Sequence, residues 1–129
     1  MAMIPFSTEQ PEAAFSRFTR DWFRFLARDE FASAATALDE PNYYGQSWSA
    51  DAIRSELFDY TGGQPFSVTD PDSLGSDPYQ TLVAFNDGSG YSFDCTVPLN
   101  GEWSDLTAQF EFMRRATGFA ARLHALHVL

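Results

Sequence analysis

The sequence predicts one α+β domain over residues 1–129, with three N-terminal helices packed on a curved antiparallel β-meander. Three observations predict this fold class. Residues 11–60 carry apolar side chains at helical spacing, and residues 81–128 alternate between apolar and polar with a period of two. No linker, repeat or low-complexity segment separates the two halves. Because each half has one apolar face, each needs the other to cover it.

A β-hairpin is the part of the sheet that the sequence defines best. Residues 91–97 alternate, and residues 106–112 return with the same alternation. Between them, Asn100 and Gly101 tolerate the positive φ of a tight turn. Cys95 falls in the apolar row of the first strand, so we interpret it as a small buried thiol and not as a nucleophile.

Three helices are predicted ahead of the sheet, each with its own start. Ser7 and Gln10 can form a capping box in front of a helix that opens with Pro11. Asp29 can cap a second, shorter helix, and Ser49 can cap a third. The apolar stripes expected to face the core comprise Phe15, Phe18, Trp22, Phe25 and Leu26, then Phe31, Ala34, Ala35 and Leu38, and finally Ile53, Leu57 and Tyr60.

Two further strands complete a predicted four-stranded meander. Residues 81–85 form a strand that ends at a glycine-rich turn over 86–90, and residues 119–128 form the last strand. If the last strand alternates throughout, His124 and His127 project to opposite sides of the sheet.

Composition narrows the classes of partner. The formal net charge is −10, and every basic residue is arginine. Phosphate neutralisation needs clustered cations, so this balance argues against binding to nucleic acid or to anionic membranes. No apolar run approaches the ~20 residues that span a bilayer, and no basic segment precedes an apolar one at the N-terminus. The sequence predicts a soluble, cytoplasmic protein, and its lysine-free composition indicates a bacterial genome rich in GC.

Four arginines form a basic ridge on the first helix, opposite its apolar stripe: Arg17, Arg20, Arg24 and Arg28. We interpret this ridge as a solvated face that makes local pairs with Asp21 and its neighbours. The alternative is that it meets acidic groups of a partner.

The order of the segments resembles that of NTF2-like domains. RDEFASAA over residues 28–35, Tyr44-Gly45 and SADAIRSEL over residues 49–57 resemble the first half of such a domain, and the meander resembles the second half. The resemblance therefore covers nearly the whole chain. It implies an NTF2/cystatin-like fold and three classes of function: enzymes with a conical pocket, non-catalytic ligand binders, and immunity proteins of bacterial toxin systems. No catalytic residue of the enzymes carries over by motif.

Metal and cofactor sites are not predicted. His124 and His127 have no cysteine or carboxylate near them in sequence that would complete a ligand set. Asp70, Asp72 and Gly75 match the opening of a calcium loop, but the pattern then fails because Thr81 stands where a bidentate glutamate is needed. We interpret this segment as a turn.

The candidate binding residues are one strand carboxylate, one histidine and four aromatic side chains. Asp94 alternates with the phenylalanine row, so it is predicted to face outward. If it faced a pocket instead, desolvation would raise its pKa toward that of a general base. His124 is the second polar candidate. Large side chains with a polar tip are enriched where proteins bind partners, and the candidates of this kind are Tyr43, Tyr44, Trp48 and Trp103.

Three hypotheses of function follow. The first is a non-catalytic, immunity-type bacterial protein that binds a protein partner through an acidic surface with exposed aromatics. The second is a small-molecule binder or a lyase- or isomerase-type enzyme, with a pocket between sheet and helices that uses Asp94 or His124 with a tyrosine. The third is a subunit that forms a homodimer through its outer sheet face. An enclosed polar cavity between the first helix and the meander would favour the second hypothesis, and a solid aromatic core would favour the first.

Overall fold

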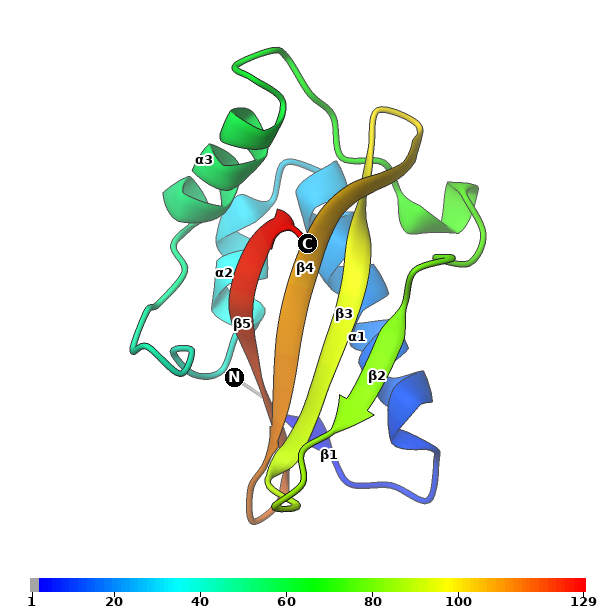
Figure 1. The fold of residues 1–129 in the computed structure, drawn as a ribbon, viewed down its shortest axis with the longest axis vertical. Coiled ribbons are helices and arrows are strands. Elements are labelled where there is room, and N and C mark those ends of the chain that lie inside the picture. The colour runs from blue at the N-terminus through cyan, green and yellow to red at the C-terminus, as the bar shows by residue number, and fades with distance from the viewer. Residues whose placement is uncertain (1–2) are drawn as a thin grey trace.

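The computed structural model describes residues 3–129 and confirms the predicted fold class. An antiparallel sheet with strand order β1-β5-β4-β3-β2 curves around one layer of helices (Figure 1). In the view of Figure 1 the strands lie in front and α1 lies behind them. The elements are β1 (Ile4–Pro5), α1 (Pro11–Ala27), α2 (Phe31–Ala37), α3 (Ala50–Tyr60), the short 3₁₀ helix η1 (Pro71–Ser73), β2 (Thr81–Ala84), β3 (Gly90–Leu99), β4 (Glu102–Arg114) and β5 (Gly118–Val128).

The core lies between α1 and the long strands, as the alternation predicts. The Phe15 ring stacks on Phe112 with ring centroids 4.0 Å apart, and it meets Phe93 at 6.2 Å. Trp22 packs edge to face against Phe110 at 5.2 Å. All five side chains are completely buried. The helices and the meander therefore share one aromatic interior.

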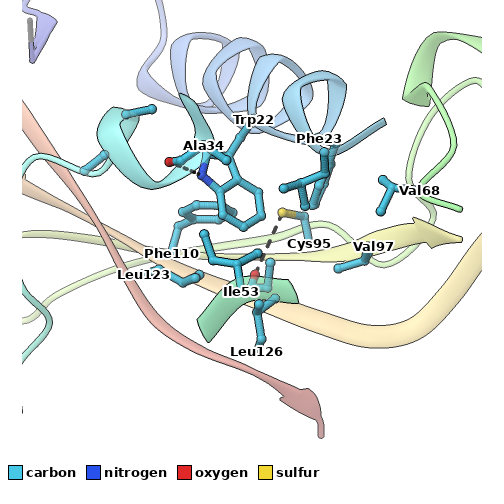
Figure 2. Packing of buried hydrophobic residues seen from close by; sticks show 14 of the residues in the cluster. Trp22, Phe23, Ala34, Ile53, Val68, Cys95, Val97, Phe110, Leu123 and Leu126 are labelled. Atoms are coloured by element: carbon cyan, nitrogen blue, oxygen red, sulfur yellow. Dashed lines mark hydrogen bonds between the residues drawn. The ribbon is translucent and has the colours of Figure 1, made fainter. Parts of the chain in front are cut away.

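Polar atoms inside this core are satisfied locally. Trp22 donates from Nε1 to the carbonyl oxygen of Ala34 at 2.9 Å, which ties α1 to α2 (Figure 2). Cys95 lies in the same cluster, where its thiol points at the carbonyl oxygen of Ala108 at 3.8 Å. Burial raises the pKa of the Cys95 thiol well above its usual range. The thiol is therefore neutral and inaccessible, as predicted from its place in the apolar row.

Two of the three predicted helix caps are wrong. Gln10 precedes α1 in an extended conformation without a side-chain cap, and Ser7 instead accepts a hydrogen bond from the Glu9 amide at 3.2 Å. Glu30 precedes α2, because Asp29 has a φ of 58°. An N-cap needs extended backbone, so a residue in the left-handed region cannot fill that position.

A β-bulge in β5 corrects the predicted placement of the two histidines. Gln109 pairs with Ala125, but its neighbour Phe110 pairs with Leu123, so His124 is an extra residue on β5. Leu123 and Leu126 both face the core, with two residues between them instead of one. An extra residue of this kind breaks the period of two. His124 and His127 therefore lie on the same side of the sheet.

A fifth strand was not predicted. β1 pairs with the start of β5, with Ile4 opposite Phe119 and Pro5 opposite Gly118. Gly118 permits this pairing because a Cβ there would collide with the carbonyl oxygen of Ile4. Two residues are too few to show an alternating pattern in the sequence.

Beyond β1, the segment of residues 39–48 covers the edge of β5. The Asp39 amide donates to the carbonyl oxygen of Ala121, and the Ala121 amide donates to Asp39 Oδ2, both at 2.8 Å. Asn42 donates from Nδ2 to the carbonyl oxygen of His124 at 3.1 Å. The segment of residues 39–48 therefore takes the place of a neighbouring strand.

Candidate functional site

Among residues 3–129, no helix covers the face of the sheet that looks away from α1 (Figure 1). We call it the open face. It is the face opposite the phenylalanine row on the three long strands, and the pairing register and the β5 bulge place on it Ser92, Asp94, Thr96, Trp103, Thr107, Gln109, Glu111, Arg122, His124 and His127.

The inner face leaves no room for a substrate between α1 and the middle of the meander. The side chains of Phe93, Phe110 and Phe112 have no exposed surface and contact one another or the helix. Asp94 and His124 lie on the other side of the sheet. A site that used either residue would therefore lie outside the sheet, and not in the internal pocket that the second hypothesis describes.

Asp94 occupies the centre of the open face, as the alternation predicts. It lies opposite Gln109 on β4, and neither this carboxylate nor the Gln109 amide has an arginine partner. Gln109 Oε1 lies 2.5 Å from His127 Nε2. Partial burial raises the pKa of Asp94, and hydrogen bonding to Gln109 and the nearby side chains of His127 and His124 oppose this rise. The result is a half-buried carboxylate that has no ion pair with the residues that the structure describes.

Two tyrosines stand at the rim of the open face, where residues 39–48 cross the edge of β5. Tyr43 and Tyr44 are each 76% exposed, and their rings meet edge to face at 5.4 Å. The Tyr44 ring also lies against His124 with centroids 5.6 Å apart. Tyr43 borders a broad open hollow of about 600 Å³, whose other lining residues are Phe85, Asn86, Asp87, Ser89, Glu111, Met113 and Arg122.

Trp48 serves the core and not the open face. Its ring packs against the buried cluster, and its Nε1 donates to the carbonyl oxygen of Leu123 at 2.8 Å. The side chain therefore anchors the segment of residues 39–48 to β5. Of the six predicted site residues, it is the one that the structure does not place on or beside the open face.

Trp103 lies at the far end of the open face, where β4 bulges before Leu106. It lines a hollow of about 250 Å³ with Tyr79, Ser104 and Asp105. The Trp103 Nε1 is buried and has no hydrogen-bond partner among residues 3–129. Tyr60 donates its hydroxyl to the Asp105 carboxylate, which raises the pKa of Tyr60. Asp105 thus links the end of α3 to β4.

An ion pair at the other end of the open face was missed from the sequence. Arg122 Nε donates to Glu111 Oε1 at 2.8 Å, and both side chains are only 15% exposed. Arg115 pairs with Glu40 beside them, and this contact lowers the pKa of Glu40. A sequence signal existed: the hairpin of β4 and β5 places Glu111 directly opposite Arg122.

Three of the four arginines of the basic ridge form ion pairs within the described residues, but only Arg24 makes the predicted local pair, with Asp21. Arg17 pairs with Glu9, while Arg20 and Arg24 both reach Asp72 next to η1. These contacts lower the pKa of the Glu9 and Asp72 carboxyls. Six of the eight arginines form ion pairs within residues 3–129; the exceptions are Arg28 and Arg114.

In the part of the chain that the structure describes, no three histidine, cysteine or acidic side chains gather as a metal site. Asp70 caps η1 through the Asp72 amide at 2.9 Å, which accounts for the calcium-like spacing. None of the helices within residues 3–129 is long and apolar enough to cross a bilayer.

Comparisons of the chain with models of protein families, with curated proteins and with solved structures gave no match.

Proposed function

We propose that this chain is a non-catalytic binding protein of bacteria, of the immunity type that its resemblance to NTF2-like domains implies. In this proposal it holds a basic protein partner against the open face. The observation that carries the proposal is the contrast between the two faces of the sheet. The inner face is filled by stacked aromatic rings, while the outer face displays exposed tyrosines at one rim and, at its centre, a carboxylate with no ion pair among residues 3–129.

The rim tyrosines supply contact area. Tyrosine offers a large, rigid surface with a polar tip, and exposed side chains of this kind commonly anchor protein interfaces. The Tyr43 and Tyr44 rings support each other, and Tyr44 rests on His124. Less conformational entropy is lost when a partner packs against side chains that are already held in place.

The charge of the open face determines which kind of partner is selected. Asp94 lies on the open face with no ion pair in the described part of the chain, on a protein whose net charge is −10. A field of one sign attracts partners of the opposite sign and speeds their association. A lysine or arginine of the partner placed on Asp94 would restore to the carboxylate the stabilisation that partial burial removes.

The experiment captures binding partners on the tagged chain and then measures the binding of each purified partner. The tagged chain, a Y43A/Y44A double variant, D94K and the control F58A are used to capture proteins from cells that carry the gene, and each captured protein is then purified and titrated. Phe58 is 51% exposed on α3, away from the open face. We expect a basic protein that binds the wild type and F58A equally and binds the other two at least about tenfold more weakly, because anchor residues typically contribute 2 kcal/mol or more.

Three outcomes would contradict the proposal. One is that no purified protein binds in a way that depends on the open face. Another is that the captured partner is acidic. The third is light scattering that shows a homodimer of the free wild-type chain and a monomer of D94K, which would support the third hypothesis instead.

A further inference from the structure

A hollow at one end of the molecule lies outside the open face and is independent of the proposed function. The N-terminal segment crosses the end of the core between the start of α1 and the ends of β3, β4 and β5 (Figure 1). It encloses a space of about 340 Å³. This volume is within the lower range of small-molecule sites, and it has room for roughly ten water-sized groups at about 30 Å³ each.

The walls of this hollow combine aromatic and aliphatic side chains with polar groups, and the polar atoms contribute slightly more of its surface. Tyr91 and Phe119 form the side next to the core, where each ring contacts Phe15. Phe6 and Ile4 close the hollow from the N-terminal segment, and Phe6 meets Phe119 edge to face at 5.2 Å. Such a surface suits a ligand with an apolar, ring-containing body.

Arg114 gives the hollow one cationic group. Its guanidinium carbon lies 5.2 Å from the Phe119 ring centroid and 5.9 Å from that of Phe6. Its Nε reaches the carbonyl oxygen of Gly88 only at 3.4 Å, and it forms no ion pair with a carboxylate of residues 3–129. Six other arginines of this acidic chain pair with carboxylates, whereas Arg114 lies at the hollow with no ion pair among residues 3–129.

One carboxylate also lines the hollow and could repel an anionic ligand. Glu9 belongs to the lining, but it accepts two hydrogen bonds from the Arg17 guanidinium. That pairing lowers the pKa of Glu9 and neutralises its charge locally. The net charge that the lining offers to a ligand is therefore that of Arg114.

We propose that this hollow binds a small monocarboxylic acid with an aromatic body, with the carboxylate on Arg114 and the ring against Phe6, Tyr91 and Phe119. The guanidinium presents paired N–H donors that match the two oxygens of a carboxylate. A ring between these walls replaces water on three aromatic surfaces. No covalent step is involved.

The test is an NMR titration of the full chain with 3-phenylpropionate, which has about eleven non-hydrogen atoms and so matches the volume. We expect saturable shifts confined to amides around the hollow, with a dissociation constant in the millimolar range that is usual for so small a ligand. The neutral isostere 3-phenylpropionamide should bind about tenfold more weakly, because hydrogen bonds to charged groups are the stronger ones. This comparison needs no variant.

Matched variants then measure the contribution of the Arg114 charge to binding. R114Q should weaken binding of 3-phenylpropionate about tenfold, and R114K should restore part of it. R28Q removes the same charge from the other unpaired arginine and should change binding less than twofold. Ala14 also lines the hollow, so A14L should block it by filling it.

Four results would overturn the proposal: shifts that do not saturate, shifts scattered over the surface, equal binding of the neutral isostere, or equal losses in R114Q and R28Q. Equal losses would show a general effect of net charge. Binding of the probe in the Y43A/Y44A variant should be unchanged, so failure here and failure of partner binding are separate results.

Discussion

At the scale of single residues, two carboxylates respond to folding in opposite directions. Partial burial raises the pKa of Asp94, whereas hydrogen bonds with Ser89 lower the pKa of Asp87. A raised folded pKa means that the ionised carboxylate destabilises the native state above that pKa. A lowered folded pKa means the reverse: the stabilisation is present above the unfolded value and is lost as the pH falls through the folded pKa.

We therefore predict opposite signs for two amide substitutions. At pH 7, D94N should raise the free energy of unfolding and D87N should lower it. The D94N difference should shrink as the pH falls through the raised pKa of Asp94, whereas the D87N difference should persist until the pH falls below the ordinary aspartate value of 3.8, because Asp87 keeps its charge to a lower pH. Urea unfolding of the three proteins at several pH values measures this. Equal signs for the two variants would show that partial burial does not govern Asp94.

The most consequential single side chain in the core is Phe15. It stacks on Phe112 and also contacts Phe93, Tyr91 and Phe119. F15A removes a buried ring at the junction of helix and sheet and should lower the free energy of unfolding by about 3–5 kcal/mol. F58A is the control, because an exposed ring contributes little. A loss below about 1 kcal/mol in F15A would contradict the shared interior.

At the scale of elements, α3 is the helix whose start the sequence identifies. Ser49 is extended, and its Oγ accepts from the Ala52 amide at 3.0 Å. S49A should lower the free energy of unfolding by about 1 kcal/mol, the usual value of an N-cap. Ser55 lies exposed inside the same helix, so S55A should change it little. Equal effects of the two substitutions would mean that the cap contributes nothing.

Periodicity explains which elements were predictable. The stripe of α1 and the alternation of β3 and β4 repeat over many residues, and the turn at Asn100 and Gly101 has the positive φ values, 52° and 90°, that such a pair permits. The bulge at His124 is one inserted residue. It does not alter the composition of β5, and it becomes visible only when the pairing register of β4 and β5 is known. The caps of α1 and α2 depended on backbone angles that residue type alone does not set.

The candidate site was predictable in part for the same reason. Asp94 could be placed outward because it lies in a regular strand. Tyr43, Tyr44 and Trp48 lie in an irregular segment, where no repeating pattern predicts which ring is buried. The hydrogen bond from Trp48 to the Leu123 carbonyl identifies Trp48 as the ring that packs inward. The hollow at Arg114 joins the N-terminal segment to four other elements, so no local stretch of sequence indicates it.

At the scale of the whole molecule, charge opposes the compact state. The chain carries 18 acidic and 8 basic residues, and most of its ion pairs are exposed. Exposed pairs contribute little each, whereas the excess of like charge repels throughout. We predict that the melting temperature rises when sodium chloride is increased from about 10 mM to 300 mM, where screening shortens the range of repulsion. A fall with salt, measured by circular dichroism, would show that the ion pairs outweigh the repulsion.

The order of the strands also bears on how the molecule avoids aggregation. The three long strands β3, β4 and β5 are consecutive within the sheet, and β1 with residues 39–48 occupies the outer side of β5. The strand left at the opposite border is β2, which has four residues. An exposed border of that length offers few amide and carbonyl groups on which the chain of a neighbouring molecule could continue the sheet, so fibril growth finds little template here even when the protein is concentrated.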